Sequence, residues 1–81
     1  MHPDKVAELI RAALPGAEVL VRSDDQTHFE ARVVAAEFAG KRSIARHQLI
    51  YGALGALVGR EIHALSIVAL TPEEAADGRA R

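Results

Sequence analysis

A helical segment between two strand-like segments constrains the fold of this chain more than any other feature of its sequence. Residues 28–34 alternate apolar and polar side chains, as in a strand with one buried face. Residues 43–58 place apolar side chains at helical spacing, and residues 62–70 are again strand-like. Because a helix that crosses over between two strands of one sheet favours a parallel, right-handed connection, we expect these two strands to pair in parallel.

The first part of the chain predicts a helix followed by a hairpin. Residues 3–14 have the apolar spacing of an amphipathic helix, which Leu14-Pro15-Gly16 ends. Residues 17–23 alternate as a strand, and the polar turn at 23–27 joins them to the strand at 28–34. Two alternating runs joined by so short a turn predict an antiparallel hairpin.

The last part of the chain predicts one short helix after the third strand. Thr71-Pro72-Glu73-Glu74 matches a capping box with proline at the first helical position. The order is therefore α-β-β-α-β-α, which predicts an α+β fold with a three-stranded mixed sheet and helices packed mainly on one face. We expect a single domain over residues 1–76 and a disordered C-terminal tail over residues 77–81. The strand at 62–70 is apolar on both sides, which predicts that both of its faces are covered or that neighbouring segments shield it.

The long helix is expected to begin with Ser43 as its N-cap and to end near Val58, with Gly59 as its C-cap residue. Gly52 and Gly55 lower its helix propensity, so we expect another segment to pack closely against them. The predicted buried stripe consists of His47, Ile50, Tyr51, Leu54, Leu57 and Val58.

Composition excludes several classes of function. The chain has 81 residues, enough for one small core, and no cysteine, so disulfides and thiolate chemistry are excluded. Any soft metal centre would need its sulfur ligands from another molecule. The formal net charge of −1 argues against a protein built mainly to hold nucleic acid. No apolar run reaches the roughly 20 residues that span a bilayer, and no signal peptide is evident, so we expect a cytoplasmic protein without a membrane partner.

Residue chemistry leaves few candidate sites. The four histidines lack HxH or HExxH spacing, and Ser43 and Ser66 lack a paired base and acid, so neither a single-chain metal site nor nucleophilic catalysis is supported. Lys41, Arg42 and Arg46 cluster at the start of the long helix, a position suited to phosphate. The same cluster also fits a solvated face that docks an acidic partner.

Three segments in the second half resemble one known family. They are Phe38-Ala39-Gly40, Arg46-His47-Gln48-Leu49-Ile50-Tyr51 and Ile62-His63-Ala64-Leu65-Ser66-Ile67, and Thr27-His28-Phe29 and Thr71-Pro72 follow the family order. Over about residues 6–74 the chain resembles the BolA family of small α/β proteins, and within it the IbaG-like, acid-stress branch. The resemblance implies a fold similar to the type II KH fold and a protein that is not an enzyme.

The resemblance also implies a metal ligand and a partner. In the family, the histidine of the Ile-His-Ala-Leu segment is an iron ligand when a BolA protein pairs with a monothiol glutaredoxin around a two-iron, two-sulfur cluster, with glutathione supplying a second thiolate. His63 holds that position here, and imidazole is a good ligand for iron. The cluster would belong to the shared complex, with none bound by the protein alone. The alternative for His63 is a strand-end histidine satisfied by a backbone hydrogen bond.

Two interpretations stay open for His28. Many family members carry a cysteine or histidine ligand in a longer, Gly-Gly-containing hairpin loop, whereas the turn at 23–27 has neither residue. His28 either substitutes for that ligand or is a strand histidine that pairs across the hairpin.

The remaining signature residues suggest a structural role and an alternative function. Helical spacing predicts that His47 is buried and bonds to a backbone group or to Tyr51, and the alternative is a role in proton or metal sensing. The family's second function is DNA-binding regulation of stress, growth or envelope genes, for which Lys41, Arg42 and Arg46 are the candidates. Type II KH domains clamp nucleic acid with a Gly-x-x-Gly turn, but Gly40-Lys41-Arg42-Ser43 lacks the second glycine. We therefore expect the glutaredoxin partner role first, and weak DNA binding as the alternative.

Overall fold

The computed structural model describes residues 1–77, which form three strands, three α-helices and two 3-10 turns. The elements are α1 (Pro3–Ala13), β1 (Glu18–Arg22), β2 (His28–Val34), η1 (Ala36–Phe38), α2 (Ser43–Leu54), η2 (Gly55–Leu57), β3 (Ala64–Leu70) and α3 (Pro72–Ala76). This order confirms the α-β-β-α-β-α pattern predicted from the sequence.

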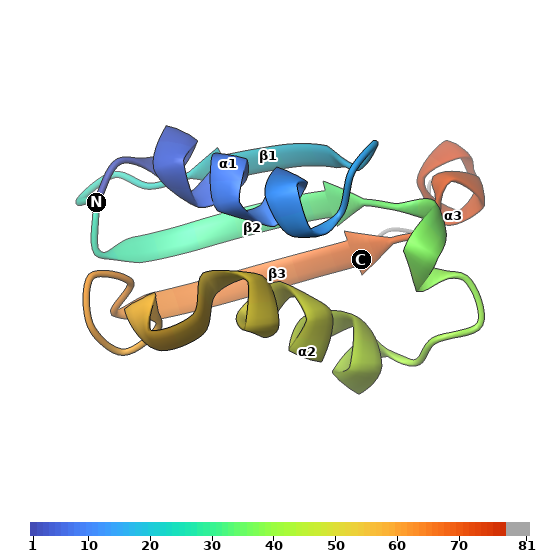
Figure 1. The fold of residues 1–81 in the computed structure, drawn as a ribbon. Helices are drawn as coiled ribbons and strands as arrows, with labels where there is room; N and C mark the ends of the chain where they lie inside the picture. The colour runs from blue at the N-terminus through green and yellow to red at the C-terminus, as the bar shows by residue number, and fades with distance from the viewer. Residues whose placement is uncertain (78–81) are drawn as a thin grey trace.

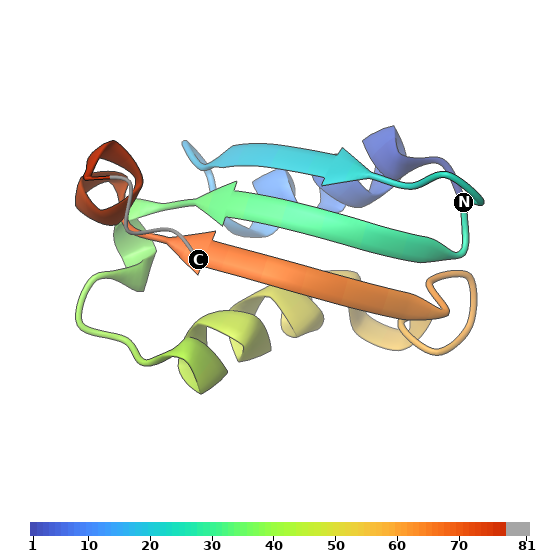
Figure 2. The same cartoon turned by 180° about the vertical axis from the view of Figure 1, so that it is seen from behind.

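The three strands form one mixed sheet in the order β1-β2-β3. β1 and β2 are antiparallel, with Val21 opposite Ala31, and β2 and β3 are parallel, with Phe29 opposite Leu65. Figure 1 shows α1 and α2 side by side on the same face of the sheet. Figure 2 shows the opposite face, which we call the rear face, without a helix over most of its length. The predicted sheet and its one-sided helical cover are confirmed.

The core lies between the sheet and the two long helices. α1 and α2 bury one stripe each, and β2 buries alternate residues, because the helical period is 3.6 residues and the strand period is 2. The largest fully buried side chains are Phe38, Ile10, Ile50, Ile62, Val6 and Val33. β3 contributes Leu65, Ile67 and Ala69, which are partly buried and pack against this core.

α2 differs from its prediction at both ends. Ser43 is the first helical residue rather than the N-cap, and the N-cap Arg42 makes no side-chain capping hydrogen bond. The helix ends at Leu54 instead of near Val58, because Gly55 adopts a φ of 57° and caps it. Residues 55–57 continue as the 3-10 turn η2, and Gly59 lies in the following loop.

The predicted buried stripe of α2 is correct for Ile50 and Leu54 but wrong for Tyr51, which is 40% exposed. Successive residues of a helix are rotated by about 100°, so the residue after Ile50 turns away from the sheet. Apart from the chain neighbours and the nearby helix backbone, no heavy atom would lie within 4 Å of a Cβ built on Gly52 or Gly55. The close packing expected around these glycines is therefore not found among residues 1–77.

β3 also differs from its prediction, because its rear face is only partly covered. Ala64 and Ser66 are exposed and Val68 is half-buried, whereas Leu70 is buried. Figure 2 shows α3 at that end of the sheet, which explains why cover is confined to the end of the strand.

The described chain ends in the short helix α3, which is capped at both ends. The predicted capping box is present: Thr71 accepts a hydrogen bond from the backbone of Glu74, and Glu74 accepts one from the backbone of Thr71. Asp77, the first residue of the predicted tail, is the C-cap residue of α3, and its N–H donates to the Glu73 carbonyl. The rest of the predicted tail, residues 78–81, lies outside the described residues. Among residues 1–77 there is no helix of the length and apolar character needed to cross a membrane.

Candidate functional site

The structure brings His28 and His63 together at one end of the sheet. β2 and β3 are parallel, so both strands begin at this end, His28 as the first residue of β2 and His63 directly before β3. The N–H groups of His63 and Ala64 both donate to the Thr27 carbonyl, at 2.8 and 3.2 Å. The two imidazole rings meet edge to face with centroids 5.3 Å apart, and both residues are exposed. Parallel pairing therefore brings together His28 and His63, which are 35 positions apart in the sequence.

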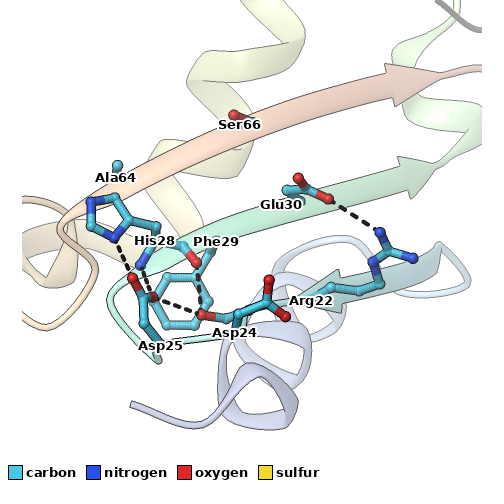
Figure 3. Close-up of a pocket in the computed structure, with 9 residues that line it drawn as sticks. Arg22, Asp24, Asp25, His28, Phe29, Glu30, Ala64 and Ser66 are labelled. Atoms are coloured by element: carbon cyan, nitrogen blue, oxygen red, sulfur yellow. Dashed lines mark hydrogen bonds and ion pairs between the residues drawn. The ribbon is translucent and has the colours of Figure 1, made fainter.

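Asp25 orients the His28 ring. Its Oδ2 lies 2.7 Å from His28 Nδ1, as the dashed line in Figure 3 shows. Its Oδ1 accepts the backbone N–H groups of His28 and Thr27, at 2.8 and 2.9 Å. These backbone donors, together with the His28 ring, hold the pKa of Asp25 well below its usual value. Because Nδ1 faces the carboxylate, Nε2 is the ring nitrogen of His28 left for another ligand.

The hairpin turn that carries Asp25 is held by its own side chains. Ser23 Oγ donates to the His28 carbonyl at 2.7 Å and accepts the Gln26 N–H at 2.8 Å. Gln26 has a φ of 61°, the one non-glycine residue with positive φ among the described residues. Sequence reasoning did not identify Asp25 as a site residue. The available signal was an aspartate in a polar turn three residues before a histidine, since such aspartates bond to nearby backbone N–H groups.

The chemistry of this edge is that of a partial metal site. The two imidazole rings contact each other and the carboxylate of Asp25 binds the His28 ring, but no group of three or more metal-ligating side chains is arranged to hold an ion within residues 1–77. We call His28, His63 and Asp25 the histidine edge. A cleft beside it on the rear face is lined by charged and hydroxyl side chains, among them Asp24, Glu30 and Ser66 (Figure 3).

Arg46 does not belong to an exposed basic cluster, which corrects the prediction for this residue. Its side chain is 12% exposed, and its guanidinium donates to both carboxylate oxygens of Glu74, at 2.6 and 3.2 Å. It also donates to the carbonyls of Ala69 and Lys41 and lies over the Phe38 ring. Arg46 therefore ties α2 to the end of β3 and to α3, while Lys41 and Arg42 remain exposed.

The Arg46 guanidinium is the main reason why the pKa of Glu74 falls to about 2, and the Thr71 N–H lowers it further. One glutamate thus completes the capping box and anchors α2. The sequence showed the capping box, but it gave no sign of the second role.

The structural role predicted for His47 and Tyr51 is not found in the expected form. His47 is half-buried on α2, and its ring makes no hydrogen bond within the described chain. Tyr51 faces solvent, so it does not pack with His47 against the sheet. The anchor between α2 and the sheet is instead Arg46.

The fold and the histidine edge define a small α+β protein in which two exposed histidines lie where a pair of parallel strands begins. The chain belongs to the BolA family: the model of this family, BolA-like protein, matches residues 11–74. A protein of the rpoN-murA intergenic region of Acinetobacter guillouiae is 39% identical over 75 residues, which cover 91% of this chain and 89% of that protein.

Two further comparisons agree with this family. The structure of a BolA homologue from Coxiella burnetii has a TM-score of 0.82 at 34% identity, and covers 94% of this chain and 97% of that chain. The Haemophilus influenzae protein named DNA-binding transcriptional regulator BolA is 41% identical over 49 residues, or 60% of this chain. The match spans 48% of the length of that protein.

Proposed function

We propose that this chain is a non-enzymatic BolA-family protein of the IbaG-like branch that binds a monothiol glutaredoxin and shares a two-iron, two-sulfur cluster with it. Its role would be cluster trafficking or iron sensing in the cytoplasm. The observation that carries the proposal is the histidine edge, where two exposed imidazoles lie with ring centroids 5.3 Å apart.

The residues at this edge fit the role of iron ligands in a shared site. The His63 ring contacts the His28 ring and makes no hydrogen bond within the described chain, so its nitrogens are free to ligate. Asp25 fixes the orientation of His28 in the way that carboxylates orient metal-bound histidines. Because the chain has no cysteine, the thiolates must come from the glutaredoxin and from glutathione. When bound, the cluster would have a higher reduction potential than one held by thiolates alone, since imidazole is the weaker electron donor.

We assign His63 as the first ligand and His28 as the second candidate. His63 occupies the position of the family's iron ligand, and its backbone N–H is fixed to Thr27, which holds the residue at the edge while its ring stays exposed. His28 is close enough to take its place, and its pairing with Asp25 makes it the better oriented ring.

The test is to add the protein to a cluster-loaded monothiol glutaredoxin under anaerobic conditions and to follow visible absorption and circular dichroism. We expect the wild-type protein to convert the glutaredoxin homodimer to a heterodimer with a changed spectrum. His63→Ala should abolish that change, because it removes the ligand. His2→Ala, which alters the exposed N-cap histidine of α1, is the matched control and should give the wild-type spectral change, with only the stability of a lost helix cap at stake.

Two results would count against this assignment. An unchanged glutaredoxin spectrum after addition of the wild-type protein would rule out cluster sharing. A normal spectral change with His63→Ala that disappears with His28→Ala would keep the function but move the ligand to His28. Far-ultraviolet circular dichroism of each variant shows that the fold is intact.

DNA binding is the second candidate function. It is supported by the printed name of the Haemophilus influenzae relative and by the exposed side chains of Lys41 and Arg42 next to the N-terminus of α2. It ranks second because Arg46 is committed to Glu74, which leaves two cations where three were expected.

A further inference from the structure

The solvent-facing side of α2 carries a glycine that the fold does not require. Gly52 lies in the second half of the helix, roughly opposite the buried side chains of Ile50 and Leu54. A Cβ at this position would meet nothing within 4 Å, and Gly52 is not among the glycines with positive φ. Glycine is one of the least favourable residues inside a helix. Nothing within the described chain offsets that cost.

Apolar side chains are exposed on both sides of Gly52. Ile44 is 70% exposed, Tyr51 40% and Leu49 37%. We call this surface the open α2 face, and it consists of Ile44, Gln48, Leu49, Tyr51 and Gly52. Positions that break a local rule without an internal gain are typical of functional surfaces, and an exposed apolar group around a missing side chain suits close contact with another protein.

The charged residues around the open α2 face are mainly positive. Residues 38–60 contain no acidic residue, the exposed Glu61 follows them directly, and Lys41, Arg42 and Arg60 are exposed and make no ion pair within the described chain. Two copies of this face would bring like charges together, which opposes self-association. Exposed isoleucine and leucine are poor contacts for phosphate, which argues against nucleic acid at this face. The complementary surface is an apolar patch of a protein, bordered by carboxylates.

The helix that carries the open α2 face leads to the histidine edge through a short loop held by backbone hydrogen bonds. The Ile62 N–H donates to the Leu57 carbonyl at 2.9 Å, and the Gly59 N–H donates to the Ile62 carbonyl at 2.7 Å. His63 therefore follows a loop that is fixed to the end of α2. Figure 1 shows this end of α2, η2 and the start of β3 at the same end of the molecule. A specific interface needs roughly 800 Å² from each partner, far more than two imidazoles supply.

We propose that the open α2 face is the second contact surface for the protein that is bound through His63. This inference rests on the proposed function. It identifies a surface that would contact the glutaredoxin protein itself, whereas His63 would contact the cluster. Gly52 lets the partner backbone approach α2 closely, and Lys41, Arg42 and Arg60 pair with its carboxylates.

The experiment titrates cluster-loaded monothiol glutaredoxin with the full chain and records both the apparent affinity and the final visible spectrum. Gly52→Leu places a side chain in the contact, and leucine is a good helix former with open space around it here, so the variant should fold. We expect Gly52→Leu and Ile44→Asp each to weaken binding by about tenfold or more, as for interface positions that carry binding energy. The end-point spectrum should be that of the wild type, because His63 is intact. Leu20→Asp, at a 57% exposed position on the rear face, is the control and should bind normally.

The outcomes separate this inference from the proposed function. If the wild type leaves the glutaredoxin spectrum unchanged, the proposed function fails, and this inference fails with it. If the wild type binds but Gly52→Leu and Ile44→Asp bind equally well, only the open α2 face is wrong. Loss of binding with Leu20→Asp alone would place the contact on the rear face. A wild-type dimer that becomes monomeric with Gly52→Leu in sedimentation would assign the face to self-association instead.

Discussion

At the scale of single residues, this protein uses charged side chains as anchors within the fold. Arg46 and Glu74 join α2, β3 and α3, and Asp25 fixes both the hairpin turn and the His28 ring. In each case a carboxylate accepts a side-chain donor together with backbone N–H groups, one for Glu74 and two for Asp25, which fixes its position more firmly than an exposed ion pair would. Arg46 and Glu74 therefore hold the end of the sheet through partners that are distant in sequence. Asp25 holds the histidine edge through the geometry of the hairpin turn.

The Arg46–Glu74 pair predicts a loss of stability in acid. The pKa of Glu74 lies at about 2 in the folded protein, below its ordinary value of 4.5, so its contribution is complete above pH 4.5 and disappears as the pH falls toward 2. Glu74→Gln keeps an acceptor for the capping box but removes the charge facing Arg46. We expect this variant to be less stable than the wild type at neutral pH, with a difference that shrinks between pH 4.5 and pH 2. Urea unfolding across this range measures it, and a constant difference would contradict the prediction.

At the scale of elements, α2 links the core to the two surfaces for which we propose a function. One side of the helix buries Ile50 and Leu54 against the sheet, the opposite side carries the open α2 face, and its C-terminal end leads to His63. The low apolar asymmetry of its sequence reflects the apolar side chains that the helix carries on both its buried and its exposed sides. An ordinary surface helix would be polar on the side away from the sheet.

Leu54→Ala should cost about 2–4 kcal/mol of unfolding free energy, because it removes a 3% exposed side chain and leaves a cavity. In a domain of this size that loss corresponds to a fall in melting temperature of roughly 10 °C or more. Thermal unfolding followed by circular dichroism measures it. Leu20→Ala is the control, since Leu20 is exposed on the rear face and should change the melting temperature little. Equal melting temperatures for Leu54→Ala and the wild type would mean that Leu54 is not on the buried side of α2.

At the scale of the whole molecule, the distribution of charge limits what the protein can bind. The net charge is −1, and the exposed cations near α2 are few once Arg46 is taken up by Glu74. Affinity for nucleic acid comes largely from the number of phosphates neutralised. The molecule as a whole is therefore better suited to a protein partner than to DNA.

We expect wild-type DNA affinity to be micromolar or weaker at physiological salt, which is the range of non-specific binding. Lys41→Ala combined with Arg42→Ala should reduce the salt dependence of that binding by about two units, one for each lost phosphate contact. Arg46→Ala should instead lower stability, because it breaks the anchor to Glu74. Fluorescence anisotropy at several salt concentrations measures the slope. Tight, sequence-selective binding that the double variant abolishes would make DNA regulation the primary function.

The sequence by itself determined the order of elements, the parallel pairing of β2 with β3 and the capping box at Thr71. The elements and the capping box depend on local periodicity and on short-range hydrogen bonds, and the parallel pairing follows from a helix that crosses over between two strands. The sequence also singled out His63 and His28, although it could not place them side by side. Family resemblance, rather than periodicity, suggested their role.

Tertiary structure alone decided which side chains are exposed and which distant residues meet. Arg46 was expected in solvent but is buried against Glu74, whereas Tyr51 was expected in the core but faces solvent. Both depend on the rotation of α2 relative to the sheet, and the apolar residues all around this helix do not specify that rotation. The meeting of His28 with His63 likewise follows from parallel strand register, a long-range property that no local pattern in the chain records.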